Sequence, residues 1–133
     1  MATILVVDDE PDVVEIVSIR LERDGHTVIS AGDGRAGLDI AMHQKPDLTI
    51  LDLMMPGLDG YEVLYQLRHN PITEDASVIL LTARSDFPSI YKGWDKGADN
   101  YVTKPFDVDK LAEMVRDALA EHEREKAEAT AVA

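Results

Sequence analysis

Four short apolar runs in this chain each end abruptly at polar residues, and this repeated pattern constrains the fold more than any other feature. The runs cover residues 4–7, 48–51, 78–81 and 101–103. The polar residues that follow them are Asp8 and Asp9, Asp52, Thr82 and Lys104. In a parallel sheet the carboxyl ends of the strands lie at one edge, where open α/β folds bind their ligands. The pattern therefore predicts one site that brings together three carboxylates, a hydroxyl and an ammonium group.

Strand-like and helix-like segments alternate along the chain. Short β-branched apolar runs are typical of strands that are buried on both faces, and apolar residues at helical spacing are typical of helices. The expected strands cover residues 4–7, 26–31, 47–51, 77–81 and 100–103. Three of the expected helices begin at Pro11, Gly34 and Pro88, and the one at Pro88 ends at Lys96. Two more begin after the N-cap residues Asp59 and Asp107. Such alternation implies right-handed crossovers and a parallel sheet with helices on both faces.

Composition narrows the class of protein. The 133 residues suit a single domain, and 45% hydrophobic with 29% charged residues predicts a globular chain. No apolar run approaches the length of a membrane span, and the amino terminus enters a strand-like run at once, without a signal peptide pattern. The absence of cysteine excludes disulfides and thiolate metal sites. We therefore expect a soluble cytoplasmic protein that does not contact a membrane.

The formal net charge of −13 disfavours one class of partner. A surface that is so acidic repels phosphate backbones, and we expect no direct binding of nucleic acid by this chain. Away from the predicted site, the acidic residues are expected only to keep the protein soluble.

Three carboxylates at one sheet edge repel one another. Two unit charges about 4 Å apart repel by roughly 4 kcal/mol at an effective dielectric near 20. A hard divalent cation would relieve this repulsion, and oxygen-only ligands suit Mg²⁺ or Mn²⁺. Protonation of one carboxylate, with a raised pKa, is the alternative. A single aspartate at a strand end is often only a turn former or a helix cap, but Asp8, Asp9 and Asp52 together favour a functional site.

Thr82 and Lys104 add a hydroxyl donor and a cation to these carboxylates. Taken alone, the lysine would be an ordinary surface charge and the threonine an ordinary strand residue. A carboxylate, a divalent cation, a hydroxyl donor and a lysine are the groups needed for phosphoryl transfer. In that reaction the carboxylate attacks phosphorus and the other groups neutralise the phosphoryl oxygens.

The same residues resemble the motifs of a known family. The motifs are Asp8-Asp9, Asp52 with residues 54–60, Thr82-Ala83, residues 97–99 with Tyr101, and Lys104-Pro105-Phe106. In this order and at these spacings they resemble the receiver domain of two-component response regulators, from Ile4 to about Leu119. The resemblance implies a flavodoxin-like (βα)5 fold, a doubly wound parallel sheet of five strands in the order 2-1-3-4-5. We expect the receiver domain to cover residues 1–121, followed by a helical extension or linker over residues 122–133.

The resemblance also implies a phosphoacceptor and a metal site. Asp52 would accept the phosphoryl group. Asp9, Asp52 and the backbone carbonyl of Met54 would hold Mg²⁺, with Mn²⁺ as a substitute. Asp8 would act on the metal mainly through bound water.

Further residues would bind the phosphoryl group and respond to it. Thr82, Lys104 and the backbone amide of Ala83 would bind its oxygens. Tyr101 would turn inward when Thr82 moves toward the phosphate. The peptide bond between Lys104 and Pro105 would be cis, a geometry essentially confined to proline.

By the same resemblance the chain is a phosphorylation-activated signalling switch, not an enzyme acting on other substrates. A sensor histidine kinase or a phosphotransfer protein would supply the phosphoryl group from a phosphohistidine. The surface formed by residues 88–96, 100–103 and the helix after Asp107 would then change its preference for a downstream protein or a fused effector domain. A homodimer stays open, although Asn100 stands where many relatives carry an aspartate; Asp99 and Arg116 are alternative contacts.

Other classes of site fit the residues less well. A haloacid-dehalogenase-like phosphatase would need an Asp-x-Asp pair after the first strand, whereas Asp8 and Asp9 are adjacent. A Ca²⁺-binding loop needs alternating oxygen ligands around a central glycine, which is absent. A flavodoxin-type FMN carrier would want a hydroxyl- and glycine-rich loop where Asp8, Asp9 and Glu10 would repel its phosphate. A scaffold that uses this fold without phosphorylation stays open.

Overall fold

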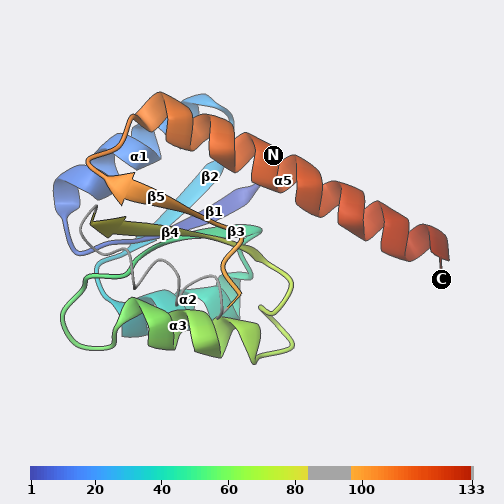
Figure 1. Cartoon of the computed structure of the whole chain (residues 1–133), viewed down its shortest axis with the longest axis horizontal. Helices are drawn as coiled ribbons and strands as arrows, with labels where there is room; N and C mark the ends of the chain where they lie inside the picture. Colours follow the sequence, from blue (N-terminus) through green and yellow to red (C-terminus); the bar gives the residue numbers. More distant parts are fainter. Residues whose placement is uncertain (84–96, 133) are drawn as a thin grey trace.

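A parallel sheet forms the centre of the molecule. The computed structural model describes residues 1–83 and 97–132, and within them five parallel strands pair in the order β2-β1-β3-β4-β5 (Figure 1). The strands are β1 (Thr3–Val7), β2 (Thr27–Ala31), β3 (Leu48–Asp52), β4 (Ser77–Ala83) and β5 (Asn100–Lys104). The predicted flavodoxin-like topology and strand order are therefore confirmed.

Helices cover both faces of this sheet. The described helices are α1 (Pro11–Arg23), α2 (Gly34–Gln44), α3 (Gly60–Arg68) and α5 (Val108–Val132). Helices α1 and α5 pack on one face, and α2 and α3 pack on the other (Figure 1). Each of these four begins at the residue that the sequence indicated. The helix expected over residues 88–96 lies outside the described residues.

Aspartate caps explain where two of the helices begin. The carboxylate of Asp59 accepts a hydrogen bond from the Glu62 amide at 3.0 Å, at the start of α3. The carboxylate of Asp107 accepts one from the Asp109 amide at 2.8 Å, at the start of α5. An N-cap of this kind typically contributes about 1 kcal/mol to stability. Both predicted caps are confirmed.

Alternate residues of the central strands pack into two separate hydrophobic cores, one on each face of the sheet. Ile4 and Val6 pack with residues of α1 and α5, whereas Leu5 and Val7 pack with residues of α2 and α3. Successive side chains of a strand point to opposite faces of the sheet, so a strand covered on both faces must be apolar throughout. Full burial of one such side chain contributes about 1.5–3 kcal/mol. This burial explains why the strands read as continuous apolar runs in the sequence.

The strand register brings the polar ends of the runs to one edge. Val7 of β1 pairs with Leu51 of β3, so Asp8 and Asp52 follow at the same level. Asp52 in turn pairs with Leu81 of β4, the residue before Thr82. The last pair of β4 and β5 joins Ala83 to Lys104.

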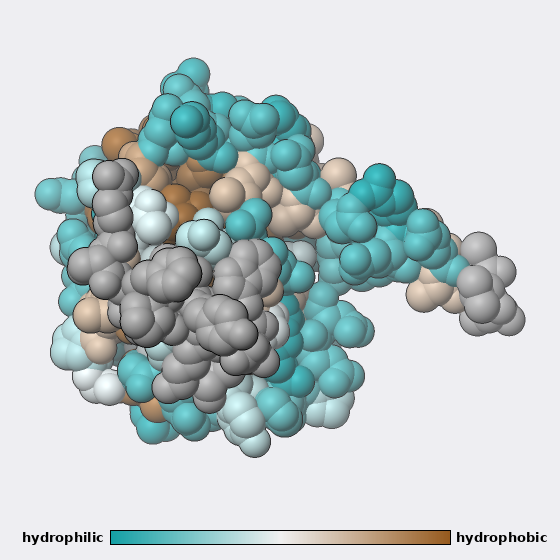
Figure 2. Space-filling model, viewed as in Figure 1, coloured by the Kyte–Doolittle hydropathy of each residue, from teal (hydrophilic) through white to brown (hydrophobic). Residues whose placement is uncertain are grey.

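Helix α5 extends past the core of the domain. Its residues Leu111 and Val115 are buried against the sheet and α1, but almost all of residues 120–130 are exposed. Figure 1 shows this C-terminal part projecting beyond the sheet, and Figure 2 shows that its surface is mainly hydrophilic. The division of the chain at residue 121 stays a prediction, because α5 crosses it without a break. Among the described helices none is both long and apolar enough to cross a bilayer.

The start of α3 packs closely against the end of β3. A Cβ atom at Gly60 would lie 2.7 Å from Leu53 Cα and 2.8 Å from the Asp52 carbonyl oxygen, both backbone atoms that cannot move cheaply. We expect Gly60→Ala to lower the free energy of unfolding by about 1–3 kcal/mol, the usual effect of overpacking. Urea denaturation measures this change.

Gly32→Ala is the matched control for this substitution. A Cβ at Gly32 would meet no atom within 4 Å, so its effect should stay within about 0.5 kcal/mol. Equal stability of the two variants would contradict the close approach of α3 to β3.

Candidate functional site

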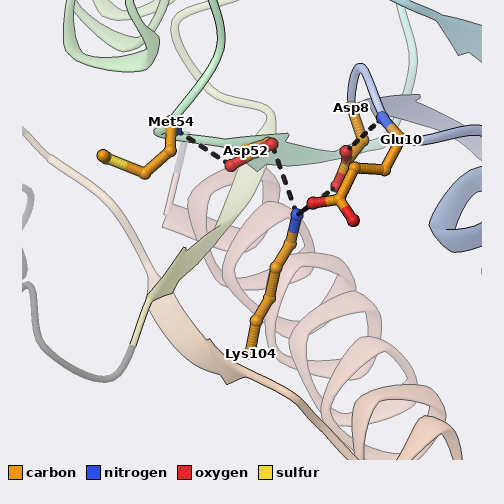
Figure 3. A network of polar contacts seen from close by, with 5 residues as sticks. All are labelled: Asp8, Glu10, Asp52, Met54 and Lys104. Atoms are coloured by element: carbon orange, nitrogen blue, oxygen red, sulfur yellow. Dashed lines mark hydrogen bonds and ion pairs between the residues drawn. The ribbon is translucent and has the colours of Figure 1, made fainter.

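Two buried aspartates form the floor of the site. Asp8 directly follows β1 and Asp52 ends β3, and each residue is only 1% exposed. Asp8 Oδ1 accepts a hydrogen bond from the Glu10 amide at 2.9 Å, and Asp52 Oδ1 accepts one from the Met54 amide at 2.9 Å. These amides orient both carboxylates (Figure 3). The local chain after each strand therefore fixes the direction of its carboxylate.

The ammonium group of Lys104 lies among three carboxylates. Lys104 Nζ is 2.9 Å from Asp8 Oδ2, 2.9 Å from Glu10 Oε1 and 3.3 Å from Asp52 Oδ2 (Figure 3). The contacts with Glu10 and Asp52 are hydrogen bonds, whereas the contact with Asp8 is an ion pair without hydrogen-bond geometry. Within the described part of the chain, Asp8 Oδ2 is thus buried with a charge partner but without a hydrogen bond.

Burial and neighbouring charges shift two pKa values in this site. Burial raises the pKa of Asp52, and the charge of Asp8 adds to the shift, while the Met54 amide and Lys104 oppose it. For Lys104, burial acts to lower the pKa, but the contacts with Asp8 and Glu10 and the charges of Asp52 and Asp8 outweigh it and raise the pKa. Lys104 therefore stays protonated at neutral pH, whereas ionisation of Asp52 is disfavoured by its surroundings.

The acidic residues form a group that suits a divalent cation. Asp8, Asp9, Glu10 and Asp52 each offer a carboxylate oxygen, and these oxygens all lie within 4.8 Å of one another. Asp9 and Glu10 are exposed, so the group is open to solvent on one side. Oxygen-only donors and the buried Asp8 oxygen without a hydrogen bond fit a hard cation such as Mg²⁺.

The remaining predicted site residues lie on β4 and β5 at the same edge. Thr82 is fully buried and pairs with Thr103, and Ala83 is partly buried. Tyr101 is half-buried and packs against the core on the α2 and α3 side. The peptide bond between Lys104 and Pro105 is cis. Their roles in phosphoryl binding and switching, like the Met54 carbonyl as a metal ligand, stay predictions.

Two contacts were not predicted from the sequence. Glu10 binds Lys104 directly, and the signal available for it was its position in the acidic run after β1. Asp99, left open as a dimer contact, is held within the chain, because its Oδ2 accepts hydrogen bonds from Arg68 Nη2 at 2.7 Å and from the Val78 amide at 2.8 Å. Arg68 lies at the end of α3, and no local sequence pattern connects it to Asp99.

Comparison with known proteins assigns the chain to a family. Residues 4–116 match the response regulator receiver domain family. This match covers most of the chain, so the protein belongs to that family. It is a receiver domain of the kind found in two-component response regulators, which is a regulatory domain.

Individual relatives agree with this assignment. The chain is 43% identical over 124 residues to the DNA-binding dual master transcriptional regulator RpaA of Synechocystis, covering 93% of this chain and 52% of RpaA. It is 39% identical over 119 residues to the response regulator ArlR of Staphylococcus epidermidis, covering 90% of this chain and 53% of ArlR. The chain therefore spans about half the length of these relatives.

Two solved structures share the fold over almost their entire length. The chemotaxis protein CheY4 of Vibrio cholerae is 29% identical with a TM-score of 0.83, and the match covers 89% of this chain and 98% of CheY4. A receiver domain protein of Clostridium thermocellum is 30% identical with a TM-score of 0.85, covering 92% of this chain and 98% of that one.

The raised pKa of Asp52 leads to a prediction about stability. Its ionised form is less stable in the folded protein than in the unfolded chain, so Asp52→Asn should raise the free energy of unfolding at pH 7 without divalent cations. The gain should be on the order of 1 kcal/mol, a usual size for one substitution. It should shrink as the pH falls through the raised pKa toward 3.8, because Asp52 then becomes protonated in the folded protein first. Urea denaturation between about pH 8 and about pH 4 measures both effects.

Asp75→Asn is the control for removing an acidic charge. Asp75 is exposed, and its substitution should change stability by less than about 0.5 kcal/mol. A loss of stability in Asp52→Asn at pH 7, or a gain independent of pH, would contradict the raised pKa of Asp52 that burial and the charge of Asp8 produce.

Proposed function

We propose that this receiver domain accepts a phosphoryl group on Asp52 and signals through the resulting change in its surface. The observation that carries the proposal is the placement of Lys104 Nζ 3.3 Å from a buried Asp52 carboxylate, at the mouth of a cluster of carboxylates. A buried nucleophile beside a fixed cation and a cation-binding cluster provides what phosphoryl transfer requires.

The transfer step follows from these groups. An oxygen of the ionised Asp52 carboxylate attacks phosphorus and forms a new P–O bond. The bond from phosphorus to the donor breaks, which is a P–N bond for a phosphohistidine, and its electron pair stays on the donor imidazole. Lys104, the Thr82 hydroxyl and the Ala83 amide would bind the phosphoryl oxygens. The domain would act only on itself, in its own phosphorylation and dephosphorylation.

A divalent cation would complete the site. Asp9, Asp52 and the Met54 carbonyl would hold Mg²⁺, and Asp8 would contribute mainly through bound water; Mn²⁺ would suit the same oxygen donors. Bound there, the cation would neutralise negative charge on the carboxylates and on the transferred group. Asp8 and Asp52 supply the buried carboxylates, and Lys104 supplies the positive charge that remains when the metal is absent.

Phosphorylation would change the surface through Thr82 and Tyr101. Thr82 is buried at the end of β4, and a shift of its hydroxyl toward the phosphate would leave space on the side of the sheet where Tyr101 packs. Inward rotation of Tyr101 would then alter the surface of β5 and α5; the signalling face expected from the sequence also includes residues 88–96, which lie outside the described residues. The size of this response is limited by the difference in contact energy between the two states.

The partners follow from this role and from the relatives. We infer a sensor histidine kinase or a phosphotransfer protein as the cytoplasmic phosphodonor. The output would be a downstream protein or an effector domain fused after residues 122–133, and pairing of two copies is an alternative. RpaA is a DNA-binding regulator by name, but the acidic charge of the present chain argues against its own contact with DNA.

Phosphorylation itself is directly testable. Incubation with Mg²⁺ and a small phosphodonor such as acetyl phosphate should add the mass of one phosphoryl group, as measured by intact-mass spectrometry. Asp52→Asn should abolish the addition, because it removes the attacking oxygen, and Asp75→Asn should retain it. Phosphorylation of Asp52→Asn to the wild-type extent would show that Asp52 is not the acceptor.

Metal binding should also appear as a change in thermal stability. At ten times its Kd, Mg²⁺ should stabilise the wild type by about 1.4 kcal/mol, or about 3–5 °C in Tm for a domain of this size. Asp9→Asn should lose most of this shift, because it removes a ligand, and Asp12→Asn, outside the acidic group, should keep it. Equal shifts in all three proteins would place the cation elsewhere.

A further inference from the structure

Glu10 contributes a carboxylate to the site, although the reaction proposed above assigns it no role. Its Oε1 lies 2.9 Å from Lys104 Nζ, closer than the 3.3 Å between Nζ and Asp52 Oδ2. Figure 3 shows Glu10 approaching the ammonium from the side of Asp8, across from Asp52. Lys104 is therefore shared between Asp52 and a pair of carboxylates on the other side.

The backbone of Glu10 is fixed on both sides. Its amide donates to Asp8 Oδ1 at 2.9 Å, and its carbonyl accepts from the amides of Val13 and Val14 at 3.1 and 3.2 Å. Glu10 is the N-cap residue of α1, but its side chain makes no capping hydrogen bond. A polar side chain at an N-cap ordinarily accepts from an amide of the first helical turn. The carboxylate of Glu10 accepts from Lys104 instead.

Exposure makes the contact between Glu10 and Lys104 reversible. The Glu10 side chain is 61% exposed, whereas that of Asp52 is 2% exposed. A solvent-exposed ion pair shifts an equilibrium by only about 1.5- to 5-fold. Water can therefore replace Glu10 when Lys104 finds a stronger acceptor, and a phosphoryl group presents such acceptor oxygens.

We propose that Glu10 is a positioning residue that competes with a phosphoryl group on Asp52 for the ammonium of Lys104. The proposal rests on the phosphorylation of Asp52 proposed above. In the resting domain, Glu10 and Asp8 keep Nζ closer to themselves than to Asp52. When the phosphoryl group arrives, Lys104 exchanges its hydrogen bond to Glu10 for one to a phosphoryl oxygen. Lys104 stays protonated throughout, and no covalent bond changes in this exchange.

The competition predicts different effects on two binding constants. Beryllium trifluoride with Mg²⁺ serves as a phosphoryl mimic, and isothermal titration calorimetry measures its Kd and that of Mg²⁺ alone on the whole chain. Glu10→Gln keeps the length of the side chain but removes its charge. It should lower the Kd for beryllium trifluoride by about 1.5- to 5-fold, the range for one exposed ion pair. The Kd for Mg²⁺ alone should not fall, because the variant has lost a negative charge beside the cation site.

Asp12→Asn controls for the loss of a nearby negative charge. Asp12 is exposed in the first turn of α1, two residues after Glu10, and lies outside the acidic group. Its substitution should leave the Kd for beryllium trifluoride unchanged. The ¹⁵N NMR signal of Lys104 Nζ provides a second readout, and it should move in Glu10→Gln but not in Asp12→Asn.

Several results would overturn the proposal. Equal Kd values for beryllium trifluoride in the wild type and Glu10→Gln would show that Glu10 does not compete. Equal gains in Glu10→Gln and Asp12→Asn would show a general charge effect. A loss of Mg²⁺ affinity of about tenfold or more in Glu10→Gln would show that Glu10 serves the metal. Failure of the wild type to bind beryllium trifluoride at all would instead reject the phosphorylation of Asp52, and this outcome is distinct from the others.

Discussion

Repulsion between carboxylates, held together by a parallel sheet, is the physical basis of this site. Asp8 and Asp52 are buried side by side at the ends of β1 and β3, with Asp9 and Glu10 at the rim. In water such groups would separate, but the apolar strands that carry them are fixed by burial on both faces. The ammonium of Lys104 lies among them. The site therefore carries an acidic cluster whose oxygen donors suit a divalent cation.

The same repulsion would link the resting domain with the proposed phosphorylated state. The pKa values of Asp52 and Lys104 are both raised. The site therefore disfavours the ionised form of Asp52 and favours the protonated form of Lys104. A phosphoryl group on Asp52 would add negative charge beside Lys104 and would strengthen the attraction of its ammonium toward Asp52. Glu10 is the most exposed acceptor of this ammonium, so it is the contact that can be released most readily. The strength of the signal would then depend on a residue outside the set that carries out phosphoryl transfer.

Much of this arrangement could be predicted because it follows from local patterns. The runs before Asp8 and Asp52 are apolar in both alternating positions, which identifies buried parallel strands, and strand ends of a parallel sheet share one edge. The caps at Asp59 and Asp107 were predictable because a capping side chain acts within three residues of its own position. These inferences need no knowledge of distant contacts.

Contacts between side chains that are far apart along the chain could not be predicted from the sequence. Glu10 and Lys104 are 94 residues apart in the sequence. Their pairing depends on how the start of α1 and the end of β5 approach each other. The pairing of Arg68 with Asp99 likewise depends on packing between the end of α3 and the start of β5. Long flexible side chains can reach many partners, so residue type and spacing do not select one.

Anomalous scattering from crystals soaked in Mn²⁺ tests the central claim most directly. If the carboxylates converge as described, one strong Mn²⁺ peak should lie at the carboxyl edge of the sheet, within coordination distance of oxygens from Asp9, Asp52 and Met54. Mn²⁺ peaks scattered over the acidic surface, with none at this edge, would contradict the account.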